Sequence, residues 1–490
     1  MVLIGIDLGT TGLRSIVFSE DLNILGEAYT EYPLIFLSSD MIEQDANLWW
    51  ELTKKVIKES VTKSKADPDD IKGISVSSQG ISIVPVDRNC TPLRNSINWL
   101  DNRAKEQKKQ ICEKLSEHEI FNITSNKPSS GSDIGKIMWL QQHEPEMFRK
   151  TYKILTAHDF IVTKMCGEFM TDHTMAGGTL LYDIKKGVWS DKMLDLIGIG
   201  PELLPEIKRG GTPVGTLRKE VASELGLRSN TVVSLGGQDQ KCAALGAGIN
   251  QDVITISLGT AAAITQICDR PILDESIGIP CYPYLMDETW EFEGCVNTAC
   301  SSLKWLRDTL FRHKSYKELD DMAESCYGKN NQVFFYPYLS GMGTPHADRD
   351  VRGFFYGISL STKEEEMVKG LLEGVAYQIK TNVDTIESAN RPAKEIRLFG
   401  GGSKSAIWCQ MISNITGKKV VTLYSPETAG IGAAILAGIG EGVYKSYDAA
   451  TRLVQCAKAF EPDAEKSRMH DTVYKEYRAI EKIMAQVGRL

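Results

Sequence analysis

Two short stretches decide the fold of this chain: Ile6-Asp7-Leu8-Gly9-Thr10-Thr11 near its start, and Ile256-Ser257-Leu258-Gly259-Thr260-Ala261 about 250 residues later. In each, an apolar run stops at Leu-Gly-Thr and a second β-branched run follows, which is typical of a β-hairpin. An internal repeat indicates a repeated structural unit. The pair therefore predicts two topologically similar lobes that meet near Gly246–Asp252.

Strand-like and helix-like segments alternate around both turns. Helical apolar spacing runs over Asn47–Ser64, and a second helix is predicted from Lys241 onward. The predicted strands are Val2–Asp7, Arg14–Phe18, Ile71–Ser77, Ile81–Val86, Ser229–Leu235, Val253–Ser257 and Ala262–Ile267. Such alternation favours an α/β fold.

Length and composition exclude several classes of protein. The 490 residues suffice for more than one domain, and 42% hydrophobic with 24% charged residues is ordinary for a folded globular chain. The net charge of -8 and the lack of a basic run argue against a nucleic-acid partner, and no stretch is apolar enough to span a membrane. Eleven scattered cysteines without a CxxC pair indicate neither disulfides nor a zinc site, so we expect a cytoplasmic protein.

A Leu-Gly-Thr turn suits phosphate binding. Glycine lets the backbone approach a ligand closely, and threonine adds a hydroxyl donor. The alternative is a hairpin that needs glycine only for its turn. Two such turns in facing lobes favour a nucleotide whose phosphates are held from both sides, with Asp7 offering a carboxylate to Mg²⁺.

A second candidate site lies in Leu235–Gln240, beside the expected junction of the lobes. Asp239 follows a predicted strand and a double glycine, and α/β proteins keep their chemistry at the carboxyl ends of strands. Phosphoryl transfer to an alcohol needs a base that accepts the hydroxyl proton. Asp239 suits that role, and it equally suits the N-cap of the following helix. The residues alone leave both interpretations open.

A triple glycine, Gly400–Gly402, precedes Ser405 and a predicted helix. A flat purine could lie against such glycines, although the stretch matches neither a Walker A loop nor GxGxxG. A flexible strand-to-helix turn is the alternative.

With these motifs in order, the chain resembles the FGGY carbohydrate kinases, which share a two-lobed, actin-like (ribonuclease H-like) ATPase fold with a central crevice. The matching segments are Ile6–Thr11, Ile42–Asp45 with Trp49-Trp50, Trp99–Arg103, Gly236–Gln240, Ser257–Thr260, Tyr336–Leu339 through Thr344-Pro345 to Arg352-Gly353, Gly400–Ser405 and Gly430–Gly438. The resemblance implies a sugar-binding and catalytic lobe over residues 1–248 and a nucleotide-binding lobe over 249–490. It also implies that the protein uses ATP and Mg²⁺ to phosphorylate a small sugar or polyol.

The resemblance further implies roles for single residues, with Asp239 as the base and Asp7 as a holder of Mg²⁺. ATP would meet Gly9, Thr10, Thr11, Arg14, Gly259, Thr260, Gly401 and Ser405. The sugar or polyol would meet Gln79, Trp99, Asp101, Arg103 and Gln240. For Trp99 the competing interpretation is a place in the core, and for Arg103 an ion pair with a surface acid.

The substrate is the least defined point, because the chain departs from two familiar subfamilies. After the glutamine that corresponds to Gln79, glycerol kinases carry Arg-Glu and xylulokinases carry Met-His, whereas this chain has Gly80-Ile81. We expect a ketopentose such as xylulose, with glycerol, an alditol or gluconate as alternatives. An actin-like ATPase scaffold is the alternative from another class of protein, and a homodimer is a further expectation.

Overall fold

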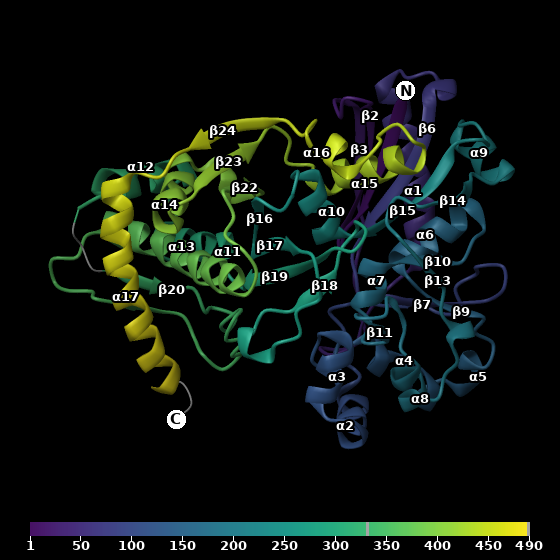
Figure 1. Ribbon diagram of the computed structural model, residues 1–490, viewed down its shortest axis with the longest axis horizontal. Coiled ribbons are helices and arrows are strands. Elements are labelled where there is room, and N and C mark those ends of the chain that lie inside the picture. Colours follow the sequence, from purple (N-terminus) through teal and green to yellow (C-terminus); the bar gives the residue numbers. More distant parts are fainter. Residues whose placement is uncertain (330–332, 488–490) are drawn as a thin grey trace.

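The computed structural model describes residues 1–329 and 333–487, which form two lobes, each built around one mixed β-sheet (Figure 1). The strand order is β14-β15-β6-β1-β2-β3 in the N-terminal sheet and β18-β19-β17-β16-β22-β23-β24 in the C-terminal sheet. Each sheet contains one predicted hairpin: β1 (Val2–Leu8) pairs antiparallel with β2 (Gly12–Ser19), and β16 (Val253–Leu258) with β17 (Ala262–Cys268). Both hairpins are confirmed.

The remaining strands complete these sheets and form smaller ones. In the N-terminal sheet they are β3 (Ile24–Glu31), β6 (Ile71–Ser78), β14 (Pro213–Thr216) and β15 (Val232–Gln238). In the C-terminal sheet they are β18 (Cys281–Pro283), β19 (Trp290–Val296), β22 (Glu395–Phe399), β23 (Lys419–Leu423) and β24 (Cys456–Phe460). A five-stranded sheet has the order β4 (Ile35–Phe36), β5 (Ile42–Gln44), β8 (Ser96–Ile97), β7 (Ile83–Val86) and β9 (Lys153–Thr156). Three two-stranded pairs are β10 (Met170–Asp172) with β13 (Glu206–Lys208), β11 (Tyr182–Asp183) with β12 (Val188–Trp189), and β20 (Phe334–Tyr336) with β21 (Phe354–Tyr356).

Helices cover the sheets and form the lower part of the N-terminal lobe in Figure 1. The helices of the first half are α1 (Ala46–Ser64), α2 (Lys105–Lys114), α3 (Glu117–Thr124), α4 (Asp133–His143), α5 (Pro145–Phe148), α6 (Ala157–Cys166), α7 (His173–Gly177), α8 (Asp191–Ile197), α9 (Lys219–Leu225) and α10 (Asp239–Gly246). Those of the second half are α11 (Cys300–Leu310), α12 (Tyr316–Cys326), α13 (Glu364–Ala389), α14 (Ala406–Thr416), α15 (Thr428–Gly440), α16 (Tyr447–Thr451) and α17 (Ala464–Val487).

Parallel pairing brings candidate residues to one edge of the N-terminal sheet. β6 pairs parallel with both β1 and β15, with Asp7 opposite Ser77 and Gln238 opposite Ser78. The carboxyl ends of the three strands therefore lie together, as in other α/β proteins that place their chemistry at such an edge. In the other lobe β16 and β22 are also parallel, with Ser257 opposite Phe399, so the second Leu-Gly-Thr turn lies beside the triple glycine.

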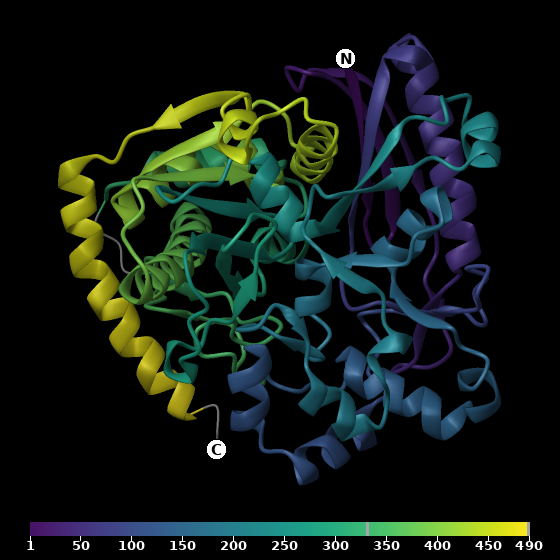
Figure 2. The same ribbon diagram turned by 45° about the vertical axis from the view of Figure 1, so that its right-hand side comes forward.

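Helix α15 belongs to the second half of the sequence but packs against β1, β6 and β15 of the first half, and along α10 (Figures 1 and 2). Glycines permit this contact. A Cβ on Gly246 of α10 would lie 1.9 Å from the carbonyl oxygen of Thr428, and one on Gly432 of α15 would lie 2.0 Å from that of Cys242. Hydrophobic residues of both halves share this core, among them Ile16 and Ala434.

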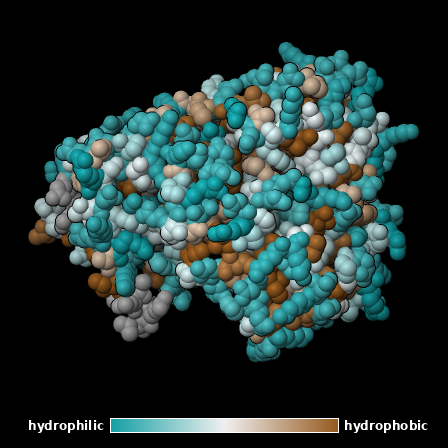
Figure 3. Space-filling model, in the orientation of Figure 1, coloured by the Kyte–Doolittle hydropathy of each residue, from teal (hydrophilic) through white to brown (hydrophobic). Residues whose placement is uncertain are grey.

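The opposite edge of the molecule is formed by α17, which packs on α14 and runs along the outer side of the C-terminal lobe in both ribbon views (Figures 1 and 2). The face shown in Figure 3 is mostly hydrophilic, with hydrophobic residues scattered over it. Among the described residues no helix is both long and apolar enough to cross a membrane.

Candidate active site

The two glycine turns are each closed by a backbone hydrogen bond from the glycine and face one cavity. Gly9 donates its N–H to the carbonyl oxygen of Gly12 at 2.9 Å, and Gly259 donates to that of Ala261 at 2.9 Å. Thr10 from the first turn and Thr260 from the second line the same cavity. Turns of this kind, approaching from two lobes, are suited to hold a chain of phosphates between them.

The cavity between the lobes has a volume of ≈ 470 Å³, which is within the range of small-molecule sites. Both lobes contribute to its wall, and most of the lining side chains are polar or small. The lining residues are Thr10, Gln79, Gly80, Ile81, Trp99, Thr174, Met175, Gly178, Gln238, Asp239, Gln240, Lys241, Ser257, Gly259, Thr260, Ala261, Ala263, Tyr282, Glu293 and Cys295.

Asp239 is the first residue of α10, and its carboxylate faces the cavity. The N-cap is the preceding residue, because the Gln238 side chain accepts hydrogen bonds from the N–H groups of Gln240 at 3.0 Å and Lys241 at 3.3 Å. Asp239 accepts through Oδ1 from Gln238 and from the Gln240 N–H. Among the described residues no donor is bonded to its Oδ2, which leaves that oxygen for a substrate hydroxyl.

A second carboxylate, that of Asp7, affects the ionisation of Asp239. Burial raises the pKa of Asp239 to about 7, and the charge of Asp7 adds to the rise. Burial also raises the pKa of Asp7 to about 6, although Ser77 donates a hydrogen bond to it at 3.1 Å. A carboxylate whose ionisation is disfavoured by a neighbouring carboxylate would be stabilised by a divalent cation, and Mg²⁺ is commonly held by one or two carboxylates together with substrate phosphates. Within the described residues no group of three or more His, Cys, Asp or Glu forms a metal cluster.

Three of the predicted sugar-binding residues line the cavity: Gln79, Trp99 and Gln240. Gln79 is buried and held by side-chain hydrogen bonds to Gln44 at 2.9 Å and from Asn98 at 3.3 Å. The indole N–H of Trp99 donates to the Thr10 hydroxyl at 2.9 Å, and the side chain is exposed, so the core interpretation of Trp99 is wrong.

The structure does not bring the other two, Asp101 and Arg103, to the cavity wall. Their side chains are buried and joined by hydrogen bonds of 2.8–2.9 Å, and Arg103 also reaches Glu43 at 2.9 Å. Asp101 accepts in addition from the backbone N–H of Ile42 at 2.6 Å. The pair is therefore a buried cross-link, not the surface ion pair that was the competing interpretation for Arg103.

Several predicted nucleotide-binding residues lie near the cavity without lining it. Gly9 and Thr11 flank Thr10 in the first turn, and Arg14 is held in ion pairs with Glu27 and Glu427.

In the other lobe the adenine candidates stand at the start of α14. The Ser405 hydroxyl accepts from the N–H of Trp408 at 3.2 Å as the N-cap and donates to Asp320 at 2.8 Å. A Cβ on Gly401 would meet no atom within 4 Å, which means that the loop presents an open backbone surface.

Comparison with known proteins agrees with this geometry. The model for the N-terminal domain of the FGGY family of carbohydrate kinases matches residues 2–246, and that for its C-terminal domain matches residues 254–441. The chain belongs to the FGGY family of carbohydrate kinases. It is therefore an enzyme that transfers a phosphoryl group to a carbohydrate, and kinases of this family use ATP as the donor.

Individual relatives match this chain over nearly its full length. The chain is 30% identical to a xylulose kinase of Bacillus subtilis, over 98% of this chain and 96% of the relative, and 29% identical to a gluconokinase of the same organism, over 100% and 96%. The crystal structure of a gluconate kinase from Lactobacillus acidophilus superposes with a TM-score of 0.92 at 26% identity, covering 99% of this chain and 98% of that one. The predicted α/β fold with two actin-like lobes is confirmed.

Sequence reasoning missed how the kinase shapes the turn after Gln79. Ile81 has a φ of +53°, which is rare for a β-branched residue, and β7 begins only at Ile83 rather than at the predicted Ile81. The buried Lys136 donates from Nζ to the carbonyl oxygen of Ile81 at 2.6 Å and pairs with Asp133 at 3.2 Å. In the sequence Asp133 and Lys136 are three residues apart on a helix, a spacing that ordinarily indicates a surface pair.

The strands β18 and β19 also supply cavity residues that the sequence did not reveal: Tyr282, Glu293 and Cys295. They lie more than forty residues after Asp239, and no motif connects the two segments. Only the pairing of β19 with β17 and β18 carries them to the cavity.

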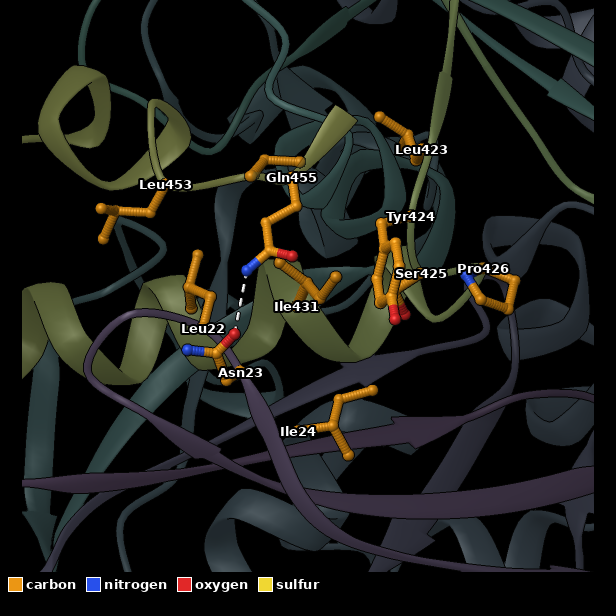
Figure 4. Close-up of a pocket in the computed structure, with 11 residues that line it drawn as sticks. Leu22, Asn23, Ile24, Leu423, Tyr424, Ser425, Pro426, Ile431, Leu453 and Gln455 are labelled. Carbon is orange, nitrogen blue, oxygen red and sulfur yellow. Dashed lines mark hydrogen bonds between the residues drawn. The ribbon is translucent and has the colours of Figure 1, made fainter. Parts of the chain in front are cut away.

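A second cavity lies at the junction of the lobes, between the β2–β3 turn and the segments around β23 and β24 (Figure 4). Its lining is largely apolar, with Leu22, Ile24 and Leu453 among its residues, and Gln455 donates to Asn23 across it at 2.9 Å. None of its lining residues is an acid, a histidine or a lysine, so it offers no acid–base chemistry.

Proposed function

We propose that this kinase phosphorylates a hydroxyl group of a ketopentose such as xylulose, with Asp239 as the base. The observation that carries the proposal is the Asp239 carboxylate, which faces the cavity between two glycine turns and has one oxygen that receives no hydrogen bond from the described residues. The similarity to a xylulose kinase along the full chain supports a five-carbon substrate.

In this proposal Asp239 Oδ2 accepts the hydroxyl proton while the hydroxyl oxygen bonds to the γ-phosphorus of ATP and ADP leaves. Asp7 would hold Mg²⁺, which when bound neutralises charge on the phosphate oxygens. Gln79, Trp99 and Gln240 would orient the sugar. Asp101 and Arg103 do not line the cavity and would act indirectly, through Ile42 and Glu43 of the strand whose Gln44 accepts a hydrogen bond from Gln79.

Each lobe would bind one of the two ligands. Residues 1–248 would bind the sugar and 249–490 the nucleotide, with Gly401 and Ser405 beside the adenine. The phosphates would lie between Gly9, Thr10, Thr11 and Arg14 on one side and Gly259 and Thr260 on the other. Arg14 would exchange its ion pair with Glu427 for a phosphate oxygen.

A substrate panel tests the proposal. We expect ketopentoses and five-carbon alditols to be preferred over glycerol and D-gluconate by at least about tenfold in kcat/KM, because a site built for particular hydroxyls rejects analogues that lack them. The measurement is ADP release with each compound at saturating ATP and Mg²⁺. A tenfold preference for glycerol or D-gluconate over every five-carbon compound would overturn the ketopentose proposal.

The dependence of kcat/KM on pH below neutrality tests whether Asp239 is the base. Because the pKa of Asp239 is raised to about 7 and only the ionised form accepts a proton, kcat/KM should fall about tenfold per unit below pH 7 and level off above pH 8. The profile is measured with the sugar varied at saturating ATP and Mg²⁺. A rate that stays constant from pH 8 down to pH 5 would contradict the assignment.

The cytoplasmic location and the homodimer stay predictions. Both can be examined on the intact protein, the first by cell fractionation and the second by light scattering.

A further inference from the structure

One wall of the cavity carries a charged pair that the proposed phosphoryl transfer does not use. Lys241, one turn into α10, donates from Nζ to Oε2 of Glu293 on β19 at 2.7 Å, and both residues line the cavity. The pair joins the helix that carries Asp239 to the sheet of the other lobe. It lies on the same cavity as the sugar-binding candidates Gln79 and Trp99.

The ammonium group of Lys241 is enclosed by charged and aromatic partners. Besides Glu293, it pairs with Glu291 at 3.1 Å and lies 4.3 Å from the centre of the Tyr282 ring. The Lys241 side chain is only 5% exposed. A substrate anion would have to displace a buried carboxylate to reach this cation, which costs the pairing of that carboxylate.

The carboxylate of Glu293, by contrast, is open to the cavity. Its side chain is 24% exposed, whereas that of Glu291 is fully buried behind it. Hydrogen bonds among the described residues leave Oε1 of Glu293 without a donor, so this oxygen can accept from a sugar hydroxyl.

The charge balance of the wall follows from these contacts. Of the described residues that line the cavity, only Asp239, Lys241 and Glu293 are ionisable acids or bases with a charge near neutrality. Lys241 is already paired with two carboxylates and is almost fully buried. Arg103, the other cation expected at the sugar, is buried with Asp101 and Glu43 away from the wall. A negatively charged ligand would therefore meet carboxylates without a free counter-charge.

We propose that Glu293, held by Lys241, is a specificity-determining residue that accepts a hydroxyl of a neutral ketose or alditol and repels a sugar acid. The inference rests on the proposed function and narrows its substrate to uncharged polyols. A carboxylate opposite a carboxylate inside a partly desolvated cavity is strongly unfavourable, because the low local dielectric weakens screening.

The test compares pairs of ligands that differ only at one terminal carbon. Xylitol is paired with D-xylonate, and D-glucitol with D-gluconate, since each acid carries a carboxylate where the alditol has a hydroxymethyl group. Binding to the full-length kinase is measured by titration calorimetry at pH 8. We expect each acid to bind at least about tenfold more weakly than its alditol, and the gap to narrow as NaCl rises from about 0.05 to 0.5 M, because salt screens the repulsion.

Two variants test whether the charge of Glu293 causes the difference in binding between each acid and its alditol. Glu293→Gln keeps the shape of the side chain, removes the repelling charge and releases Lys241 from one of its two carboxylate partners. The ratio of the Kd of each acid to the Kd of its alditol should therefore shrink at least fivefold. Glu291→Gln is the matched control, because it also removes one carboxylate from Lys241 but faces no ligand, and it should change the gap less than twofold. Melting temperatures show whether each variant is folded.

The outcomes separate the two proposals. Acids that bind as tightly as their alditols to the wild-type enzyme, with no dependence on salt, would overturn the role of Glu293 while leaving the kinase reaction intact. Equal shifts in Glu293→Gln and Glu291→Gln would overturn it as well. If neither member of either pair binds, the inference that Glu293 accepts an alditol hydroxyl fails, whereas the ketopentose proposal is decided separately by the substrate panel. The wild-type comparison decides the question even if Glu293→Gln does not fold.

Discussion

Asp239→Asn is expected to lower the rate of sugar phosphorylation by about 10²–10⁴-fold while leaving the fold and nucleotide binding intact. The amide keeps the size of the side chain but cannot accept the hydroxyl proton, and general-base catalysis contributes about 10²–10⁴-fold. The loss should fall on kcat, measured in single-turnover experiments, while the Kd for ATP changes little.

The control for this variant is Asp45→Asn. Asp45 is the N-cap of α1, where its carboxylate accepts from the N–H groups of Asn47 and Leu48. Because asparagine caps a helix about as well as aspartate, this exchange should change stability by less than about 1 kcal/mol and have little effect on activity. If Asp239→Asn behaved like Asp45→Asn and retained activity within tenfold of the wild type, Asp239 would be a structural residue of α10 and not the base.

Gly432→Ala is expected to destabilise the protein by about 3 kcal/mol through a single methyl group. The new Cβ would lie 2.0 Å from the Cys242 carbonyl oxygen and 2.7 Å from its carbonyl carbon, so the backbones of α10 and α15 must separate. The measurement is the urea midpoint of unfolding. Because α10 begins with Asp239, kcat should fall too.

The matched substitution is Gly401→Ala, whose Cβ would meet no atom within 4 Å. It adds the same methyl group without a clash, so its urea midpoint should stay close to that of the wild type. An equal loss of stability in both variants would mean that the contact between α10 and α15 does not depend on close approach of the two backbones.

The hairpins could be predicted because their signal is local. An apolar run, Leu-Gly-Thr and a second β-branched run specify a strand, a tight turn and a returning strand within one short segment, wherever that segment lies in the chain. Repetition of that signal at Gly9 and Gly259 was sufficient to predict two lobes. Asp239 could be singled out for the same reason, since a strand and a double glycine immediately precede it.

What could not be predicted depends on contacts between distant segments. Arg103 reads as a sugar ligand in the sequence, yet Asp101 beside it and Glu43 sixty residues earlier neutralise it inside the lobe. Glu293 carries no motif and reaches the cavity only through the strand order of the C-terminal sheet. The packing of α15 against the N-terminal sheet could not be predicted for the same reason. Its glycines indicate close packing, but they do not indicate which element it packs against.

The hydrogen bond from Lys136 to the turn after Gln79 affects which substitutions this part of the cavity wall can accept. Lys136 donates to a main-chain atom, the carbonyl oxygen of Ile81, so this hydrogen bond does not depend on which side chain stands at position 81. Position 80 is more restricted, because a Cβ on Gly80 would lie 3.2 Å from Cγ of Gln238. Position 81 is therefore a place where a substitution can reshape the cavity wall while the turn keeps its hydrogen bond to Lys136.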